Sequence, residues 1–294
     1  MKRFFFMIIL ICAFVMCSCS VTNTQTQIAA TTLPVYEFAT YLCEDTPLCI
    51  TRLVTESVSC LHDYTLQTKQ MRAAESAHTL LLSGAGLDDF LDGIATQATV
   101  TVDCSYDIDL ICGINESDHE HANKNEHHHE QDPHIWLSPT NAKIMAQNIY
   151  DGLSMQYPEY QDTFHANLIE LCNKLNALEQ YGKEQLNTLS TRNLITFHDG
   201  FAYLAQAFDL TILHAIEEES GSEASAGELI EIIKLINANE INAIFTEING
   251  STSAAEIIAK ECGIKVFQLD MCMGEQNYFD AMYHNIDTLK EALE

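Results

Sequence analysis

The stretch that decides the fold is residues 158–189, PEYQDTFHANLIELCNKLNALEQYGKEQLNTL. Its apolar side chains recur at intervals of four and three residues, which places them on one face of a helix. These positions are Phe164, Leu168, Leu171, Leu175 and Leu178. At a rise of 1.5 Å per residue, a helix of about 30 residues spans roughly 45 Å. A helix of that length is too long to connect two parallel strands of the same sheet. The sequence therefore predicts one long rigid helix, with residues 157–190 as the segment that links two lobes.

Short β-rich runs alternate with helical patterns on both sides of this helix, which is typical of parallel β-α units. The predicted strands are 28–33, 50–54, 79–82 and 98–102 before it, and 193–197, 211–216, 243–246 and 265–269 after it. Helices are predicted at 69–77, from 87, at 139–155, and then at 227–237, 251–262 and 278–293. We therefore predict an α/β protein of two Rossmann-like lobes with parallel sheets. The N-terminal lobe covers residues 28–156 and the C-terminal lobe covers residues 191–294.

Residues 1–18 have the features of a secretory signal for a lipoprotein. Two basic residues precede an apolar run over 4–16, which is shorter than the roughly 20 residues that span a bilayer. Cys19 follows a small residue, as the lipidated cysteine of a lipobox does, whereas Cys17 follows a methionine and is the poorer candidate. Plain cleavage to a soluble exported protein is the alternative. The polar residues up to 27 then form a tether, so that the segment 19–27 separates the anchor from the first lobe.

Composition excludes several classes of function. The chain has 14 basic and 42 acidic residues in 294, which gives a formal charge of −28. This charge disfavours nucleic-acid binding and the binding of anionic lipid through a polybasic segment. Of the eleven cysteines, Cys12, Cys17 and Cys19 lie in the export segment. The others form no C-x-x-C pair, so a thiolate zinc site is poorly supported. Cys43 and Cys49 flank a turn-like sequence and could pair in an exported protein; free buried thiols are the alternative.

Sequence motifs of several enzyme classes are missing. A zinc-protease motif that began at His129 would need its second histidine where Pro133 stands. The chain contains no G-x-x-x-x-G-K-[ST] nucleotide loop and no G-x-S-x-G nucleophile elbow. The glycines at 84 and 86 lack the third glycine of a dinucleotide-binding fingerprint. We therefore expect no catalytic residues.

Four residues are candidates for one metal site between the lobes. His198 and Asp270 directly follow predicted strands, His62 lies beyond another, and His134 stands in the run DPHIW at residues 132–136. Ligands of open parallel sheets bind outside the carboxyl ends of the strands. Three imidazoles and one carboxylate are a donor set that zinc favours. Glu247, also at a strand end, is the rival carboxylate. Each of these residues could instead have a structural role, such as a turn or a helix cap.

Residues 115–131 form a low-complexity, polar loop that interrupts the β-α pattern. It contains five histidines within eleven residues, namely His119, His121, His127, His128 and His129. One interpretation is a flexible, auxiliary metal-collecting arm, because imidazoles and carboxylates are interleaved there. The other is a solvated insert without function. The histidine density favours the first.

Together these segments resemble the zinc-type solute-binding proteins of ABC importers, the ZnuA/TroA-like group of cluster A-I metal-binding lipoproteins. The resemblance covers about residues 28–294. The matching segments are TTLPVYEFA at 31–39, LHDY at 61–64, SGAGLDDFL at 83–91, DPHIWLSP at 132–139, TFHDGFAYL at 196–204 (T-x-H-x-A-F-x-Y-L in the family), IFTE at 244–247 and QLD at 268–270. His62, His134 and His198 match the three histidine ligands of the family. Asp270 matches its carboxylate ligand, although the usual L-D-P-L has become Leu-Asp-Met-Cys here.

Other departures leave the ligands in place. Leu61 replaces the proline before the first histidine, Ser138 replaces the second aspartate of D-P-H-x-W-L-D-P, and residues 223–226 read EASA for E-P-S-A. Manganese-type members usually have a carboxylate in place of the third histidine, so His198 favours zinc.

The resemblance implies a monomeric, extracytoplasmic zinc-binding protein that is not an enzyme. It would be lipid-anchored to the cell membrane, on the cell surface or the periplasmic side. Zn(II) would be its transported ligand, captured between the lobes and delivered to an ABC permease driven by a separate ATPase subunit. Because neutral imidazole is the form that binds metal, zinc affinity should fall as the pH drops through about 6.5. The alternatives are manganese or iron binding in the same class, an exported zinc hydrolase if Asp270 is not a ligand, and a surface adhesin.

Overall fold

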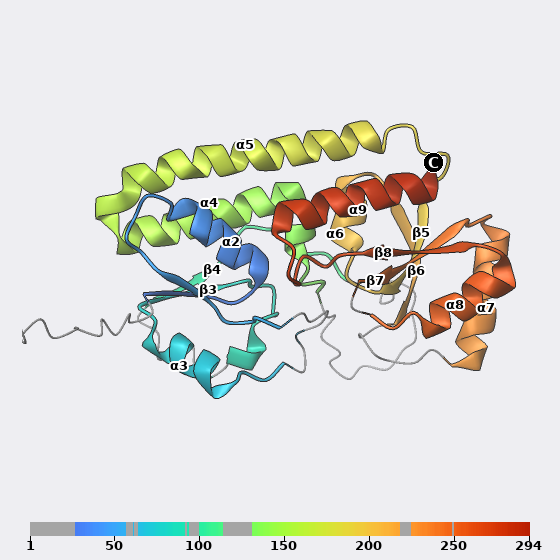
Figure 1. The fold of residues 1–294 in the computed structure, drawn as a ribbon, viewed down its shortest axis with the longest axis horizontal. Coiled ribbons are helices and arrows are strands. Elements are labelled where there is room, and N and C mark those ends of the chain that lie inside the picture. Colours follow the sequence, from blue (N-terminus) through green and yellow to red (C-terminus); the bar gives the residue numbers. More distant parts are fainter. Residues whose placement is uncertain are drawn as a thin grey trace, which may run out of the picture.

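The computed structural model describes residues 27–56, 61, 64–91, 93, 100–113, 131–217, 225–248 and 250–294. In this part of the chain two four-stranded sheets lie side by side, and every strand pair is parallel. Helix α5 runs along both lobes (Figure 1). The α/β fold of two lobes and a long joining helix is confirmed.

The N-terminal sheet has the strand order β2-β1-β3-β4. Its strands are β1 (Ile28–Ala30), β2 (Ile50–Arg52), β3 (Thr79–Leu82) and β4 (Val100–Asp103). Helices α2 (Leu33–Leu42) and α4 (Pro139–Gln156) cover one face, and α3 (Thr68–Ser76) lies on the other (Figure 1). Both α2 and α4 begin with a proline in the first turn, where the missing N–H costs no helical hydrogen bond.

The C-terminal sheet repeats this topology with the order β6-β5-β7-β8. Its strands are β5 (Asn193–His198), β6 (Thr211–Glu217), β7 (Ala243–Glu247) and β8 (Lys265–Leu269). Its helices are α6 (Ala202–Ala207), α7 (Ala226–Ala238), α8 (Ser253–Cys262) and α9 (Tyr278–Leu293). In each lobe the strand order reverses between the first and third strands, which is where open α/β sheets bind ligands.

Helix α5 (Gln161–Gln185) has 25 residues, or roughly 37 Å. The five apolar positions predicted for its buried face are all buried, and Gly182 extends that face. The helix is shorter than expected, because η5 (Pro158–Tyr160) is a separate 3-10 turn and α5 ends at Gln185. Asn187 and Thr188 follow, and their side chains compete for backbone hydrogen bonds and so favour a turn.

One hydrophobic core runs from the first lobe into the second. It includes α2, the buried face of α5 and the buried face of α9. Phe38 of α2 and Tyr278 of α9 pack edge to face with ring centroids 5.0 Å apart. The two lobes are therefore packed together along the helical side of the molecule, which limits their independent movement.

The structure also departs from the expected elements elsewhere. β1 ends at Ala30 and β2 at Arg52, before the predicted ends at 33 and 54. The helix expected from residue 87 is a single 3-10 turn, η1 (Asp89–Leu91). Positive φ angles at Ala85 and at the glycines before and after it form a tight turn, and Gly93 again has a positive φ, which ends helical geometry. Helix α6 was not expected, because its six residues are too few to show a period.

The cysteines of the described residues are free thiols, with Cys43 buried and Cys49 exposed. The possible Cys43–Cys49 pairing is therefore not present. The alternative of free buried thiols holds for Cys43, whereas Cys49 is free but exposed. Among the described residues no helix combines the length and the apolar character that a membrane crossing requires.

Candidate metal centre

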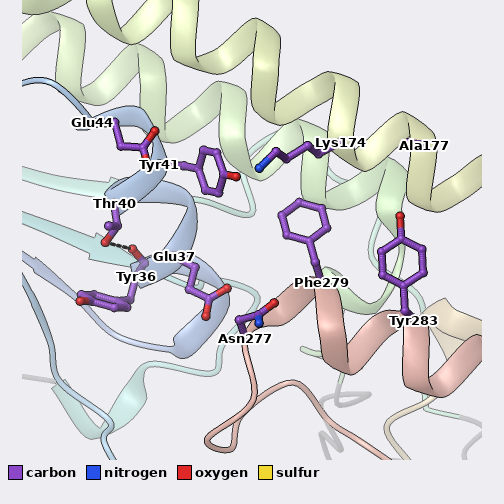
Figure 2. Close-up of a pocket in the computed structure, with 10 residues that line it drawn as sticks. All are labelled: Tyr36, Glu37, Thr40, Tyr41, Glu44, Lys174, Ala177, Asn277, Phe279 and Tyr283. Atoms are coloured by element: carbon purple, nitrogen blue, oxygen red, sulfur yellow. Dashed lines mark hydrogen bonds between the residues drawn. The ribbon is translucent and has the colours of Figure 1, made fainter.

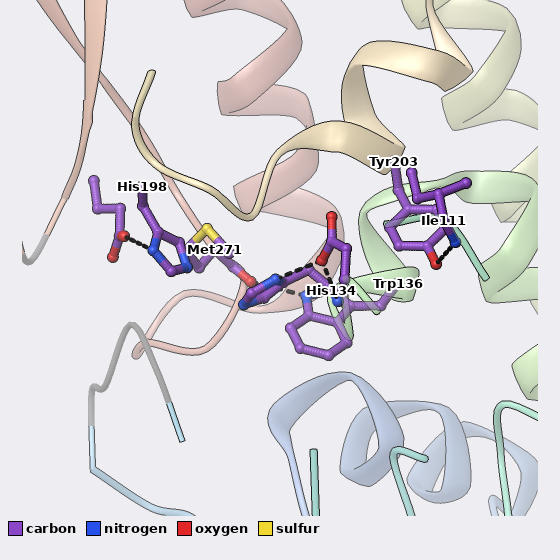
Figure 3. Close-up of polar contacts among 8 residues, drawn as sticks. Ile111, His134, Trp136, His198, Tyr203 and Met271 are labelled. Atoms are coloured by element: carbon purple, nitrogen blue, oxygen red, sulfur yellow. Dashed lines mark hydrogen bonds and ion pairs between the residues drawn. The ribbon is translucent and has the colours of Figure 1, made fainter. Parts of the chain in front are cut away.

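His198 and Glu247 are brought together by neighbouring strands. His198 is the last residue of β5 and Glu247 is the last residue of β7, so both stand at the reversal point of the C-terminal sheet. Both are 4% exposed. His198 Nδ1 lies 3.6 Å from Glu247 Oε1, which is an electrostatic contact longer than a hydrogen bond (Figure 3).

His134 comes from the N-terminal lobe, just before the 3-10 turn η4 (Ile135–Leu137). Asp132 fixes its ring, because one carboxylate oxygen, Oδ1, accepts the backbone N–H of His134 at 2.9 Å and lies 2.8 Å from Nδ1 (Figure 3). With the proton on Nδ1 and shared with Asp132, the lone pair of the ring is on Nε2. A carboxylate behind an imidazole is a common support for a metal-binding histidine.

The rings of His134 and His198 face each other across the junction of the lobes. Their centroids are 5.1 Å apart and their planes are nearly perpendicular, at 86°. Gly200 makes this approach possible. A Cβ at that position would lie 2.7 Å from Cδ2 of His198 and 2.9 Å from Cε1 of His134. Any other residue at position 200 would push against both rings.

Asp270 directly follows β8 at the same edge of the sheet and is 7% exposed. Burial raises the pKa of its carboxyl, and the hydrogen bond from the Cys272 amide to Oδ1, at 2.7 Å, opposes that rise. Asn285 of α9 holds the backbone of Asp270 with two hydrogen bonds, one at each peptide group. A bound cation would offset the cost of this buried charge.

The structure thus brings His134 and His198 together and places Asp270 at the same sheet edge. His62 lies outside the described residues, as do the five loop histidines, Cys17 and Cys19. Within the described ranges no group of three or more histidine, cysteine, aspartate or glutamate side chains is gathered to hold a metal. The four-residue ligand set therefore stays a prediction.

A separate cavity of about 530 Å³ lies between α2, α5 and α9 (Figure 2). Aromatic side chains line much of it, and Lys174 lies over the ring of Tyr41, 4.3 Å from its centroid. Among the described candidate ligands, none of His134, His198, Glu247 and Asp270 lines this cavity.

Two supporting residues were not foreseen from the sequence. Asp132 orients His134, and Gly200 leaves room for both rings. Each has a simple signal, because Asp132 stands two residues before one histidine and Gly200 two residues after another. Their roles follow only once the two histidines are known to be neighbours.

Comparisons with known proteins identify the family of this chain. The family model of ZnuA, the periplasmic zinc-uptake complex component A, matches residues 28–292. The zinc-binding lipoprotein AdcA of Streptococcus pneumoniae serotype 4 is 29% identical over 309 residues, covering 99% of this chain and 61% of that protein. This chain therefore spans less than two thirds of the length of that relative.

Solved structures show the same fold. The Zn(II)-bound ZnuA-like domain of Streptococcus pneumoniae AdcA superimposes with a TM-score of 0.75 at 27% identity, covering 92% of this chain and 99% of that one. The laminin binding protein Lmb of Streptococcus agalactiae gives a TM-score of 0.78, covering 92% and 100%, but at 19% identity it shows likeness of fold alone. Because the family model matches residues 28–292 of 294, the chain belongs to the ZnuA family, described as periplasmic component A of the zinc-uptake complex.

Proposed function

We propose that this protein captures Zn(II) between its two lobes and delivers it to the permease of an ABC importer driven by a separate ATPase. The observation that carries the proposal is the pair of buried imidazoles, one from each lobe, with ring centroids 5.1 Å apart. A buried, facing pair of histidines with supporting carboxylates suits a borderline cation such as zinc.

The proposed ligands are His62, His134, His198 and Asp270. Three imidazole nitrogens and one carboxylate oxygen complete a tetrahedral zinc site, which leaves no position open for an activated water. Nε2 of His134 is the expected ligand atom, because Asp132 engages Nδ1. Glu247, within 3.6 Å of His198, is the alternative carboxylate.

The location and partners form the second half of the proposal. We infer lipidation at Cys19 and an extracytoplasmic position on the membrane, as the name of the lipoprotein relative suggests. The protein would act as a monomer that meets the permease at the membrane surface. The His-rich loop would raise the local zinc concentration without forming the tight site.

The rival functions receive less support. Manganese or iron would favour more oxygen ligands than a site built around His134 and His198 offers. A zinc hydrolase needs an open coordination position and a nearby base, so Asp270 as fourth ligand disfavours it. An adhesin would need a surface for a matrix protein, and the likeness to Lmb is one of fold alone.

A competition titration with a zinc chelator tests the proposal on the chain from residue 20 onward. We expect one tight zinc per chain, and His198→Ala should weaken it more than about a hundredfold, because loss of a ligand exceeds the cost of losing a supporting residue. His165→Ala is the matched control, since His165 is exposed on α5, with its ring centroid 5.9 Å from that of Tyr150. Absence of a tight zinc, or equal affinities for His198→Ala and His165→Ala, would refute the proposal.

A further inference from the structure

The segment that carries Asp270 is held by hydrogen bonds from the opposite lobe. Residues 270–274 lead from β8 toward α9, both in the C-terminal lobe. The indole Nε1 of Trp136 donates to the carbonyl of Met271 at 2.8 Å. The guanidinium of Arg52, at the end of β2, donates through Nη2 to the carbonyl of Met273 at 2.9 Å and through Nη1 to that of Gly274 at 3.4 Å. Both donors belong to the N-terminal lobe.

This segment has a backbone that needs outside support. Cys272 has a φ of +57°, in the left-handed region that residues with a Cβ adopt only at a cost. Such a conformation persists when the surrounding contacts fix it. On one side the Cys272 amide donates to Asp270 Oδ1, and on the other Arg52 holds the next carbonyl along the chain. Arg52 therefore restrains the same turn in which the Cys272 amide orients the Asp270 carboxylate.

The start of α9 is tied to the same lobe. Glu37 of α2 accepts the backbone N–H of Tyr278 at 2.8 Å, and its charge lies beside the guanidinium of Arg52. The Glu37 side chain and the start of α9 face each other in Figure 2. The hydroxyl of Tyr278 donates to the carbonyl of Trp136 at 2.8 Å. The connection between β8 and α9 is thus hydrogen-bonded to the N-terminal lobe at both of its ends.

Arg52 is the contact that can be tested separately from the metal centre. Trp136 also packs edge to face against the ring of His134, with centroids 5.5 Å apart, so replacing it would disturb a candidate ligand (Figure 3). The hydrogen bonds from Arg52 to the segment both go to backbone carbonyls. Two donors from one rigid planar group fix the direction of the backbone as well as its distance.

We propose that Arg52 is a positioning residue for zinc: it holds residues 270–274, and with them Asp270, against the N-terminal lobe and slows release of the metal. This inference rests on the proposed function and identifies what sets the residence time at that site. Arg52 does not touch the metal. Replacing Arg52 removes none of the ligand residues. It frees the strained segment, so that the Asp270 carboxylate dissociates from the metal more often.

The test compares Arg52→Met and Arg52→Lys with Arg192→Met. Arg192 is the matched control, because it also donates to backbone carbonyls, of Leu186, Phe208 and Asp209, but entirely on the C-terminal side of the molecule. Zinc dissociation is followed by transfer to excess chelator. We expect Arg52→Met to bind one zinc and release it at least tenfold faster than the wild type. Arg52→Lys, with a single point charge, should fall between the two, and Arg192→Met should release zinc at the wild-type rate even if its melting temperature drops.

Hydrogen exchange of residues 270–274 in zinc-free protein gives a readout that does not depend on zinc binding. Arg52→Met should lose protection there, and Arg192→Met should keep it. Wild-type release and protection in Arg52→Met, or faster release in Arg192→Met as well, would overturn the inference while the proposed function stands. If the wild type binds no zinc, the proposed function fails and the inference fails with it, whatever the exchange shows.

Discussion

Gly200 is the residue on which the approach of the two imidazoles depends. A methyl group there would lie closer than 3.0 Å to both rings, and both rings are buried and cannot simply swing away. We expect Gly200→Ala to weaken zinc binding about tenfold or more, equivalent to roughly 1.4 kcal/mol, with the fold retained. The measurement is the same chelator competition, with far-ultraviolet circular dichroism to check the fold.

Gly227→Ala provides the control for this substitution. Gly227 lies in the first turn of α7, where, among the described residues, an added Cβ would meet only the Ser225 hydroxyl, at 3.8 Å. Its zinc affinity should equal that of the wild type. If Gly200→Ala binds zinc as tightly as Gly227→Ala, the two histidines do not share the metal in the arrangement described.

Asp88 gives the protein a specific dependence on pH. Burial raises the pKa of its carboxyl from 3.8 to about 6, and the hydrogen bond from the Gly84 amide to Oδ2 only partly opposes this. The folded state therefore holds a proton that the unfolded state has lost between about pH 4 and pH 6. Stability from this group is fully present at low pH and is lost as the pH rises through that window. The loss amounts to about 3 kcal/mol.

Asp88→Asn removes this titration. We expect the free energy of unfolding of the wild type, relative to the variant, to fall by about 2.4 kcal/mol between pH 4 and pH 7, most of the full loss, because the unfolded carboxyl is already partly ionised at pH 4. Urea denaturation of zinc-free protein at several pH values measures it. Parallel curves for the two proteins would show that Asp88 ionises normally in the folded state.

At the scale of the elements, α5 depends on a close contact that only glycine permits. A Cβ at Gly182 would lie 2.2 Å from the ring of Phe208, which follows α6 in the C-terminal lobe. We expect Gly182→Ala to lower the free energy of unfolding by about 1–3 kcal/mol through overpacking. In an open helical position the same change would stabilise by up to about 1 kcal/mol. A stabilised Gly182→Ala protein, measured by urea denaturation, would contradict the packing of α5 on Phe208.

The elements themselves could largely be predicted from the sequence. β3, β8 and α9 have the predicted bounds, because each is a continuous pattern with clear turn residues at its ends. The buried face of α5 followed from its spacing alone. The failures are local: η1 stayed a single turn because successive positive φ angles surround it, and α6 is too short to have a period.

At the scale of the whole molecule, the shared core sets what can move. α2, α5 and α9 pack together along one side, so lobe separation would expose buried aromatic residues such as Phe38 and Tyr278. Zinc release is therefore expected to proceed through local movement of the segments that carry the ligands. The contact of Arg52 with residues 273 and 274 lies at one of these segments.

The described residues that flank the His-rich loop are held in place by contacts with the rest of the protein. Cys112 and Gln131 pair in an isolated bridge, and the amide of Ile111 donates to the Tyr203 hydroxyl at 3.1 Å (Figure 3). A Cβ at Gly113 would lie 2.9 Å from Asp199 Oδ2, next to His198. Residues 115–130 can therefore be removed between fixed ends.

We expect deletion of residues 115–130 to leave one tight zinc per chain with unchanged affinity, and to remove only weak additional sites. Isothermal titration of both proteins counts the tight and weak sites. Loss of the tight site on deletion would show that a loop histidine is one of its ligands.

The way in which the site residues come together could not be predicted from the sequence. His134 and His198 were singled out by their positions, but their proximity arises from packing of the two lobes. The bond between Arg52 and Met273 joins residues 221 positions apart, and no local pattern marks it. The positions of residues along the sequence identified candidate ligands. They did not identify the residues that hold those ligands in place.

The most direct test of the zinc site is anomalous diffraction at the zinc edge from crystals of the zinc-loaded protein. We expect one strong peak about 2.0–2.2 Å from an imidazole nitrogen of each of His134, His198 and His62 and from a carboxylate oxygen of Asp270. A bond to Glu247 in place of Asp270 would change one ligand and leave the site where it is. A peak away from His134 and His198, or none, would contradict the central claim that these two histidines hold the metal between the lobes.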